Sequence, residues 1–392
     1  MQRRKSITSR LSSIALPAIF VSFMLFSCEK SDPEVEAPAG QEAKATKDRK
    51  AKQRTDEIWP RISEQENITV SEIRENSEME ILTESPTTAE INALQEKAVA
   101  LLDKGDFTAL DEMATGFLNG KERFPNGCWK IKAFHEFFEL NDNLPTKIWE
   151  SRGEALGKWI SEKPDSQFPR ISLAAFYVDY AWRARGGGFA STVSDEGWRL
   201  MTERLGKAGD VLEAAFAETE ITDPSIYVIA TRIALGAGLP PDAFDSFVVA
   251  SLELEPGYHH TLLSRGYSLL PRWYGEPGDW EFFAKYVAEE NKEMGKERYA
   301  RIVLDLFAFR QDTVNYRKLD RDLFKEGVRE IHAKYPDAIT ELSEAAYLAT
   351  VAKDRKFAEE CFDMLGDRCL VPVWKVNGRM AHYRNWAKTG KW

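Results

Sequence analysis

The chain has 392 residues, 30% of them charged, with a formal net charge of −10 at pH 7 and four cysteines. This acidic balance argues against nucleic acid as a partner, because phosphate binding requires a concentrated basic face. The cysteine spacing matches no CxxC and no cysteine–histidine pairing typical of zinc sites, so we expect neither a metal nor another cofactor.

The N-terminal residues have the pattern of a signal peptide. Four basic residues within Met1–Arg10 precede the apolar run Ile14–Phe26, which is shorter than the roughly 20 residues of a membrane-spanning helix. The sequence Leu25-Phe26-Ser27-Cys28 resembles the lipobox of bacterial lipoproteins. The resemblance implies cleavage after residue 27, lipid attachment at Cys28 and a mature net charge of −14. The alternative is an ordinary secretory signal with a chance cysteine.

The residues that follow the signal peptide indicate a flexible linker over 28–88. Glu29–Glu57 is rich in Ala, Glu, Lys and Pro and has almost no large apolar residue, which is typical of a disordered spacer. The basic stretch Lys44–Arg54 is interpreted as part of this tether. Ile58–Thr88 is assigned no fixed structure beyond short elements that lean on the body. In the lipoproteins that the lipobox resembles, an Asp after the lipidated cysteine commonly signals inner-membrane retention, so Glu29 favours the outer membrane, with the body periplasmic or surface-facing.

From residue 89 to 392 a helical period predicts one all-α domain. Its central element is the helix over Ser172–Arg185, in which Leu173, Phe176 and Tyr180 share a buried face and Gly186-Gly187-Gly188 ends the helix. The other predicted helices cover 91–101, 107–117, 131–138, 148–160, 198–215, 226–237, 243–254, 258–270, 280–294, 299–309, 323–335, 338–351, 357–365 and 380–386. No run alternates with period two long enough to predict a strand.

About fourteen helices with short loops fit an α-solenoid of stacked antiparallel helix pairs or, alternatively, a closed α/α toroid. Two sets of residues resemble parts of a tetratricopeptide repeat: Ala345, Ala346, Asp354, Ala358 and Phe362, and Phe244, Val248, Ser251 and Pro256. The full signature of the first repeat helix is absent. Together with the lipobox, the segments Ala184–Gly188 and Leu270–Gly275 resemble a family of exported bacterial helical-repeat proteins of unknown function. This resemblance implies a fold and no activity.

The aromatic residues supply the candidate ligand site. Eleven Trp and twelve Tyr exceed the usual needs of a core, and several lie beside arginines near polar turns, a combination that suits stacking and forked hydrogen bonding. The predicted ligand-binding residues are Arg185, Trp198, Tyr258, Arg272, Trp273 and Tyr274. Pro271 and Gly275 favour a rigid loop that presents two of them. The alternative is that the rings wedge between helix pairs.

Other reactive side chains do not complete a catalytic set. The stretch His135–Glu139 lacks the second histidine of the zinc-protease motif, which indicates a solvated helix face. His259-His260 is expected at the surface or at a helix N-terminus. Cys361 and Cys369 could form a disulfide across the turn at Gly366, which leaves one thiol over.

These patterns predict a lipid-anchored module of the bacterial cell envelope that binds or scaffolds a peptide or partner protein, rather than an enzyme. The membrane contact would be made through the lipid. The alternative is an exported enzyme acting on glycans or peptidoglycan, or a glycan-binding protein, on an α/α fold. The enzyme would need two carboxylates about 5–10 Å apart across a Trp-lined cleft.

Overall fold

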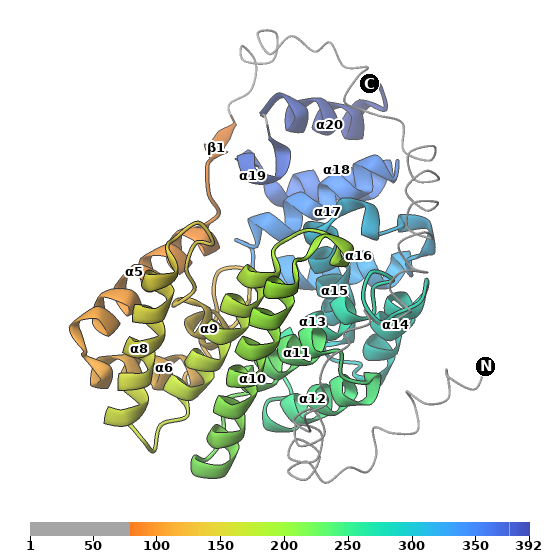
Figure 1. Ribbon diagram of the computed structural model, residues 1–392. Coiled ribbons are helices and arrows are strands. Elements are labelled where there is room, and N and C mark those ends of the chain that lie inside the picture. Colours follow the sequence, from red (N-terminus) through yellow and green to blue (C-terminus); the bar gives the residue numbers. More distant parts are fainter. Residues whose placement is uncertain (1–78, 376) are drawn as a thin grey trace. The chain divides into compact units, whose positions relative to one another are not determined.

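The computed structural model describes residues 79–375 and 377–392 (Figure 1). The predicted signal peptide, the lipidation site Cys28 and most of the predicted linker lie outside the described residues. The described chain is all-α, as the sequence predicts. It divides into two compact units, residues 89–276 and residues 277–392 together with 79–88, where the sequence predicts a single domain. The division falls at Glu276-Pro277-Gly278, where proline and glycine interrupt the helical pattern.

The first unit consists of helices joined by short connections. They are α5 (Pro86–Lys104), α6 (Phe107–Asn119), α7 (Lys130–Glu136), α8 (Thr146–Glu162), α9 (Phe168–Arg185), α10 (Asp195–Glu218), α11 (Ser225–Ala237), α12 (Pro241–Leu254) and α13 (His260–Ser268), with a 3₁₀ turn at Ala190–Thr192. Helices α9 and α10 form the most extensive contact (Figure 1). Helix α9 also contacts α7 and α11, and α11 contacts α13. Helices two positions apart in the chain are therefore in contact, as well as consecutive ones.

Helix α9 is the buried helix that the sequence predicts. It begins at Phe168, four residues before the predicted start, because Pro169 occupies the first turn, where its missing N–H costs nothing. It ends at Gly186, whose φ of +72° is accessible to glycine at little cost. Trp149 stacks on Tyr180 with ring centroids 4.9 Å apart, which fixes α8 against α9.

The second unit contains the remaining helices and a short two-stranded sheet. Its elements are β1 (Glu80–Leu82), α14 (Asp279–Glu290), α15 (Gly295–Phe309), α16 (Arg321–Lys334), α17 (Ile339–Val351), α18 (Arg355–Leu365), β2 (Arg368–Leu370), α19 (Val371–Trp374) and α20 (Asn377–Thr389), with 3₁₀ turns at Gln311–Thr313 and Tyr316–Lys318. Strand β1 pairs in parallel with β2, Ile81 opposite Cys369. The last residues of Ile58–Thr88 form β1 and begin α5, short elements of the kind expected there, while residues 58–78 lie outside the described residues.

One of the two sets of residues that resemble a tetratricopeptide repeat forms a helix pair in the second unit, and the other lies in and after α12 of the first unit. Ala345 and Ala346 are buried in α17 where it packs on α18, and Phe362 of α18 is buried too. Asp354 caps α18 by accepting a hydrogen bond from the Phe357 amide. The local pattern therefore marks a helix–turn–helix, while the assignment to that repeat family stays a prediction.

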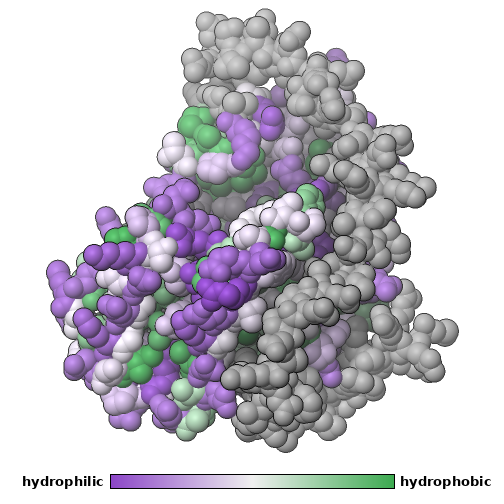
Figure 2. All heavy atoms as spheres, in the orientation of Figure 1, coloured by the Kyte–Doolittle hydropathy of each residue, from purple (hydrophilic) through white to green (hydrophobic). Residues whose placement is uncertain are grey.

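Helix length and the distribution of apolar side chains determine whether a helix can cross a membrane. In the described part of the chain, no helix combines the length and the apolar character that crossing a membrane requires. Figure 2 shows mainly hydrophilic side chains over α5, α6 and α8, with hydrophobic ones scattered between them. Scattered apolar side chains of this kind are normal for a protein surface.

Candidate functional site

Four of the six predicted ligand-binding residues lie together in the first unit. They are joined by two neighbours, and we call the group the arginine–tryptophan cluster: Trp182 and Arg185 at the end of α9, Trp198 at the start of α10, Tyr267 in α13, and Arg272 and Trp273 in the loop after α13. The Trp273 ring centroid lies 5.7 Å from that of Trp182 and 5.8 Å from that of Tyr267. The cluster thus unites segments separated by almost ninety positions in the sequence.

The connection between α9 and α10 positions Trp198. A Cβ on Gly197 would lie 2.9 Å from the Ala184 carbonyl oxygen, so glycine lets the first turn of α10 approach the last turn of α9. Ser194 caps α10 by accepting a hydrogen bond from the Gly197 amide at 3.1 Å. Trp198 is thereby placed with its ring centroid 5.7 Å from the Arg185 guanidinium carbon.

The loop after α13 is a tight turn, as the sequence predicts. The Trp273 amide donates to the Leu270 carbonyl at 2.8 Å, and a Cβ on Gly275 would lie only 1.7 Å from the Leu269 carbonyl oxygen. The loop leaves Arg272 exposed and Trp273 half-buried. The Arg272 guanidinium carbon is 5.3 Å from the Trp273 ring centroid.

Arg185 lies in an unfavourable electrostatic environment. Burial, and after it the positive charge of Arg272, lowers the pKa of Arg185. Its hydrogen bonds go to the carbonyl oxygens of Gly186 and Gly188, at 3.0 and 2.6 Å. Among the described residues no carboxylate contacts it. A negatively charged group between the two guanidinium groups would therefore relieve their repulsion.

The two remaining predicted residues anchor the fold. Tyr258 is fully buried and donates a hydrogen bond to Ser225 Oγ at 2.9 Å, and burial raises its pKa well above the usual value. The prediction that it contacts a ligand is wrong, because its ring packs on Trp129 in the core. The Tyr274 hydroxyl donates to the Leu235 carbonyl at 2.5 Å and so holds the loop against α11. Tyr274 is nevertheless 38% exposed.

His135 is buried, so the predicted solvated helix face is wrong at this position. Its Nδ1 lies 2.8 Å from Ser172 Oγ and its Nε2 lies 2.7 Å from Asp223 Oδ2. The three side chains are fully enclosed, which denies a substrate access to the serine. Asp223 also accepts a hydrogen bond from the Ser225 amide at 2.8 Å. This trio therefore ties α7, α9 and the start of α11 together. The residues are too far apart in the chain for a motif to reveal them.

A charged network lies beside the trio of His135, Ser172 and Asp223 and involves the same three helices. Arg232 bonds to Asp179 and lies 3.8 Å from Glu136 and 3.7 Å from Glu139, and Lys132 bonds to Glu136 at 2.5 Å. Burial, followed by the carboxylates of Asp179 and Glu136, raises the pKa of Glu139 to about 9. The side chain of Glu139 is nevertheless 39% exposed, so water screens part of this effect.

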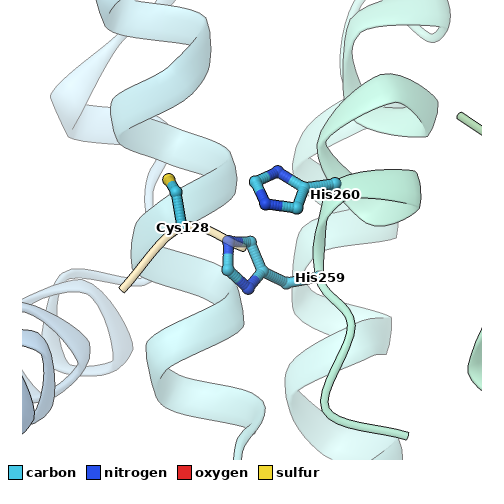
Figure 3. Close-up of side chains that lie close together, drawn as sticks. All are labelled: Cys128, His259 and His260. Atoms are coloured by element: carbon cyan, nitrogen blue, oxygen red, sulfur yellow. The ribbon is translucent and has the colours of Figure 1, made fainter. Parts of the chain in front are cut away.

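Cys128, His259 and His260 form the candidate metal-binding group of the described residues (Figure 3). Their ligand atoms all lie within 4.8 Å of one another. His259 and His260 lie at the start of α13, the helix N-terminus that the sequence gives as one of two positions, but they are only 4% and 5% exposed and so do not lie at the surface. His260 Nε2 accepts a hydrogen bond from the Trp129 amide at 3.1 Å, which draws the start of α13 inward.

The predicted disulfide does not form. Cys128, Cys361 and Cys369 are free cysteines in the described chain. Cys361 is enclosed within α18, whereas Cys369 lies in β2, whose backbone is paired with β1. Burial raises the pKa of Cys361 well above its usual value and that of Cys369 to about 11, which keeps both as unreactive thiols.

Comparison of the chain with family models, with curated proteins and with solved structures finds no match. The resemblance to an exported helical-repeat family therefore stays a prediction. The geometry of the side chains is therefore the basis for a proposal about function.

Proposed function

We propose that this chain is a lipid-anchored binding module of the bacterial cell envelope. Its arginine–tryptophan cluster would recognise an anionic segment of a peptide or partner protein. The observation that carries this proposal is the proximity of Arg185 and Arg272 without a carboxylate on Arg185 among the described residues. The anchoring part rests on the sequence Leu25–Cys28.

The chemistry of the cluster favours a carboxylate or phosphate as the recognised group. A guanidinium offers parallel N–H donors that match both oxygens of such a group, and charge-assisted bonds of this kind are about twice as strong as neutral ones. Trp182, Trp198 and Trp273 surround the two arginines and exclude water from part of their surface. Partial desolvation strengthens the attraction between the arginines and an anion.

An exposed apolar residue beside the cluster supports a macromolecular partner. Phe189 follows Gly188, whose carbonyl binds Arg185, and its side chain is 76% exposed. A large apolar side chain beside cationic and aromatic residues is a common composition of protein-binding surfaces. A peptide with an acidic residue next to an apolar one would satisfy both features.

The alternative of a glycan-cleaving enzyme receives less support. Glycoside hydrolysis requires two carboxyl groups that face a shared cleft. Those of Glu139 and Asp179 both form ion pairs with Arg232. The network therefore fits a structural role, because it already satisfies its own charges.

Binding of defined peptides to the purified full chain tests the proposal. Fluorescence anisotropy would compare a labelled acidic peptide with its Asp→Asn and Glu→Gln counterpart, and we expect binding of the acidic form that weakens with added salt. Arg185→Ala and Arg272→Ala should each weaken it about 10- to 100-fold, the value of a lost charge-assisted hydrogen bond. Arg199→Ala is the matched control, since Arg199 is an exposed arginine of α10 already paired with Glu196.

Two results would contradict the proposal. Equal binding of acidic and neutral peptides would remove anion recognition, and equal losses in the Arg185, Arg272 and Arg199 variants would reduce it to a general charge effect. The anchor needs its own test, because it is independent of the ligand site. Cys28→Ser should release the chain from the membrane fraction, and unchanged fractionation and processing would refute lipidation.

A further inference from the structure

Three side chains that ligate transition metals meet in the first unit, although their spacing in the sequence predicts no metal site. Cys128 comes from the segment before α7, and His259 and His260 come from the start of α13, about 130 positions later. In Figure 3 both imidazole rings extend from the start of α13 toward the segment that carries Cys128. We propose that these three residues form a zinc-binding site.

The distances are compatible with one shared ion after small side-chain movements. When three ligand atoms lie within 4.8 Å of one another, some point is no more than about 2.8 Å from each of them. Zinc bonds are about 2.3 Å to sulfur and 2.0–2.1 Å to imidazole nitrogen. Each ligand atom therefore has to move by less than about 1 Å, which rotation of the side chains can supply.

The ligand types select the class of metal. One thiolate and two imidazoles are typical ligands of zinc, whereas calcium and magnesium prefer oxygen. The thiolate would offset one of the two positive charges, which matters because both histidines are nearly enclosed. Three protein ligands leave a fourth position for water, as in zinc sites with an open coordination position.

The hydrogen bond of His260 gives the proposal a specific consequence. Its Nε2 accepts from the Trp129 amide at 3.1 Å, so in the neutral ring the hydrogen is assigned to Nδ1. This tautomer binds metals through Nε2. Zinc would then replace the amide as the partner of Nε2, and the Trp129 N–H would lose its acceptor. Metal loading should therefore shift the Trp129 amide resonance and speed its hydrogen exchange.

Cobalt is the spectroscopic probe for this site, since Co²⁺ replaces zinc and absorbs visible light. After removal of metal with a chelator, we expect the full chain to bind one equivalent of Co²⁺ with a near-ultraviolet thiolate charge-transfer band, and added Zn²⁺ to abolish the band. Cys128→Ser should eliminate the band. His259→Gln should weaken binding more than about 100-fold, above the usual effect of losing only an outer-sphere partner. His332→Gln, in α16, is the matched control and should bind normally.

A second measurement avoids variants that fold poorly. In the unaltered chain, zinc should protect the Cys128 thiol from maleimide, with the enclosed Cys361 as the internal reference. Equal labelling of Cys128 with and without zinc would overturn the proposal. So would a cobalt band that persists in Cys128→Ser, or binding of Cu⁺ without binding of Zn²⁺. These outcomes are independent of anion recognition by the arginine–tryptophan cluster.

Discussion

Replacement of Asp223 by alanine should strongly destabilise the first unit. The Asp223 side chain is fully buried, and both of its carboxylate oxygens have a partner. Oδ1 accepts a hydrogen bond from the Ser225 amide at 2.8 Å, and Oδ2 lies 2.7 Å from His135 Nε2. Removing it leaves the imidazole and the amide without that partner inside the core. Breaking a buried polar pair in this way costs about 3–5 kcal/mol, because the remaining partner stays desolvated. That is a large part of the stability of a domain.

Urea unfolding followed by circular dichroism measures the effect, with each transition of the two-unit chain fitted separately. Asp223→Asn should cost much less, since an amide can accept from the Ser225 N–H and donate to the imidazole. The exposed Asp210 of α10 supplies the control, and its alanine variant should lie within about 0.5 kcal/mol of the unaltered chain. A loss below about 1 kcal/mol in Asp223→Ala would refute the structural role of the trio.

Three further predictions concern the loop and the charged network. Gly275→Ala should destabilise the first unit by about 1–3 kcal/mol in urea unfolding, because its Cβ would overlap backbone at 1.7 Å, whereas Gly206→Ala, with open space inside α10, should stabilise by up to about 1 kcal/mol. Trp273→Ala should lower the melting temperature more than Arg272→Ala does, since the Trp273 ring packs against two other rings whereas Arg272 is exposed. A loss of about 3–5 kcal/mol at Trp273 would assign that residue to the core. The raised pKa of Glu139 stabilises the fold fully below its unfolded value of 4.5, and this contribution is lost as the pH rises through about 9. Glu139→Gln should flatten that part of the pH profile, and an unchanged profile would refute the raised pKa.

The sequence predicts helix ends well where one residue carries the signal. Gly186 and Gly238 follow two predicted helices and adopt φ of +72° and +73°, and α12 begins at Pro241, two residues before the predicted start. These signals are local, because a cap depends on the conformation of one or two residues. The start of α9 is less well predicted, since its first residues are buried all round and show no periodic face.

Such local patterns do not predict very short elements or the boundary between the two units. Strands β1 and β2 have three residues each, too few to show alternation, and they pair across nearly three hundred positions. The division near Pro277 resembles other loops of the chain in composition. It becomes a boundary because each unit forms a compact set of contacts of its own, which is a property of the folded chain.

The residues of the candidate sites differ in the same respect, because some of their contacts are local in the sequence and others are not. Arg185 and Trp198 flank the short connection between α9 and α10, so their proximity follows from local structure. The partners of Tyr258 and Cys128 come from distant segments. An aromatic residue beside a polar turn can face outward or inward. Tyr258 faces inward, where its hydroxyl donates a hydrogen bond to Ser225 Oγ in the core. No local pattern contains that information.

The partners of a side chain, more than its residue type, indicate whether it stabilises the fold or could bind a ligand. Arg232 contacts Asp179, Glu136 and Glu139, so its charge is satisfied within the first unit. Arg185 is half-buried as well, yet it bonds to carbonyl oxygens and lies near a second arginine. A fold gains nothing from placing two cations together, because their repulsion opposes folding. An anionic partner would convert that repulsion into attraction, and for this reason we propose the arginine–tryptophan cluster as the binding site and not the more heavily charged network on α7, α9 and α11.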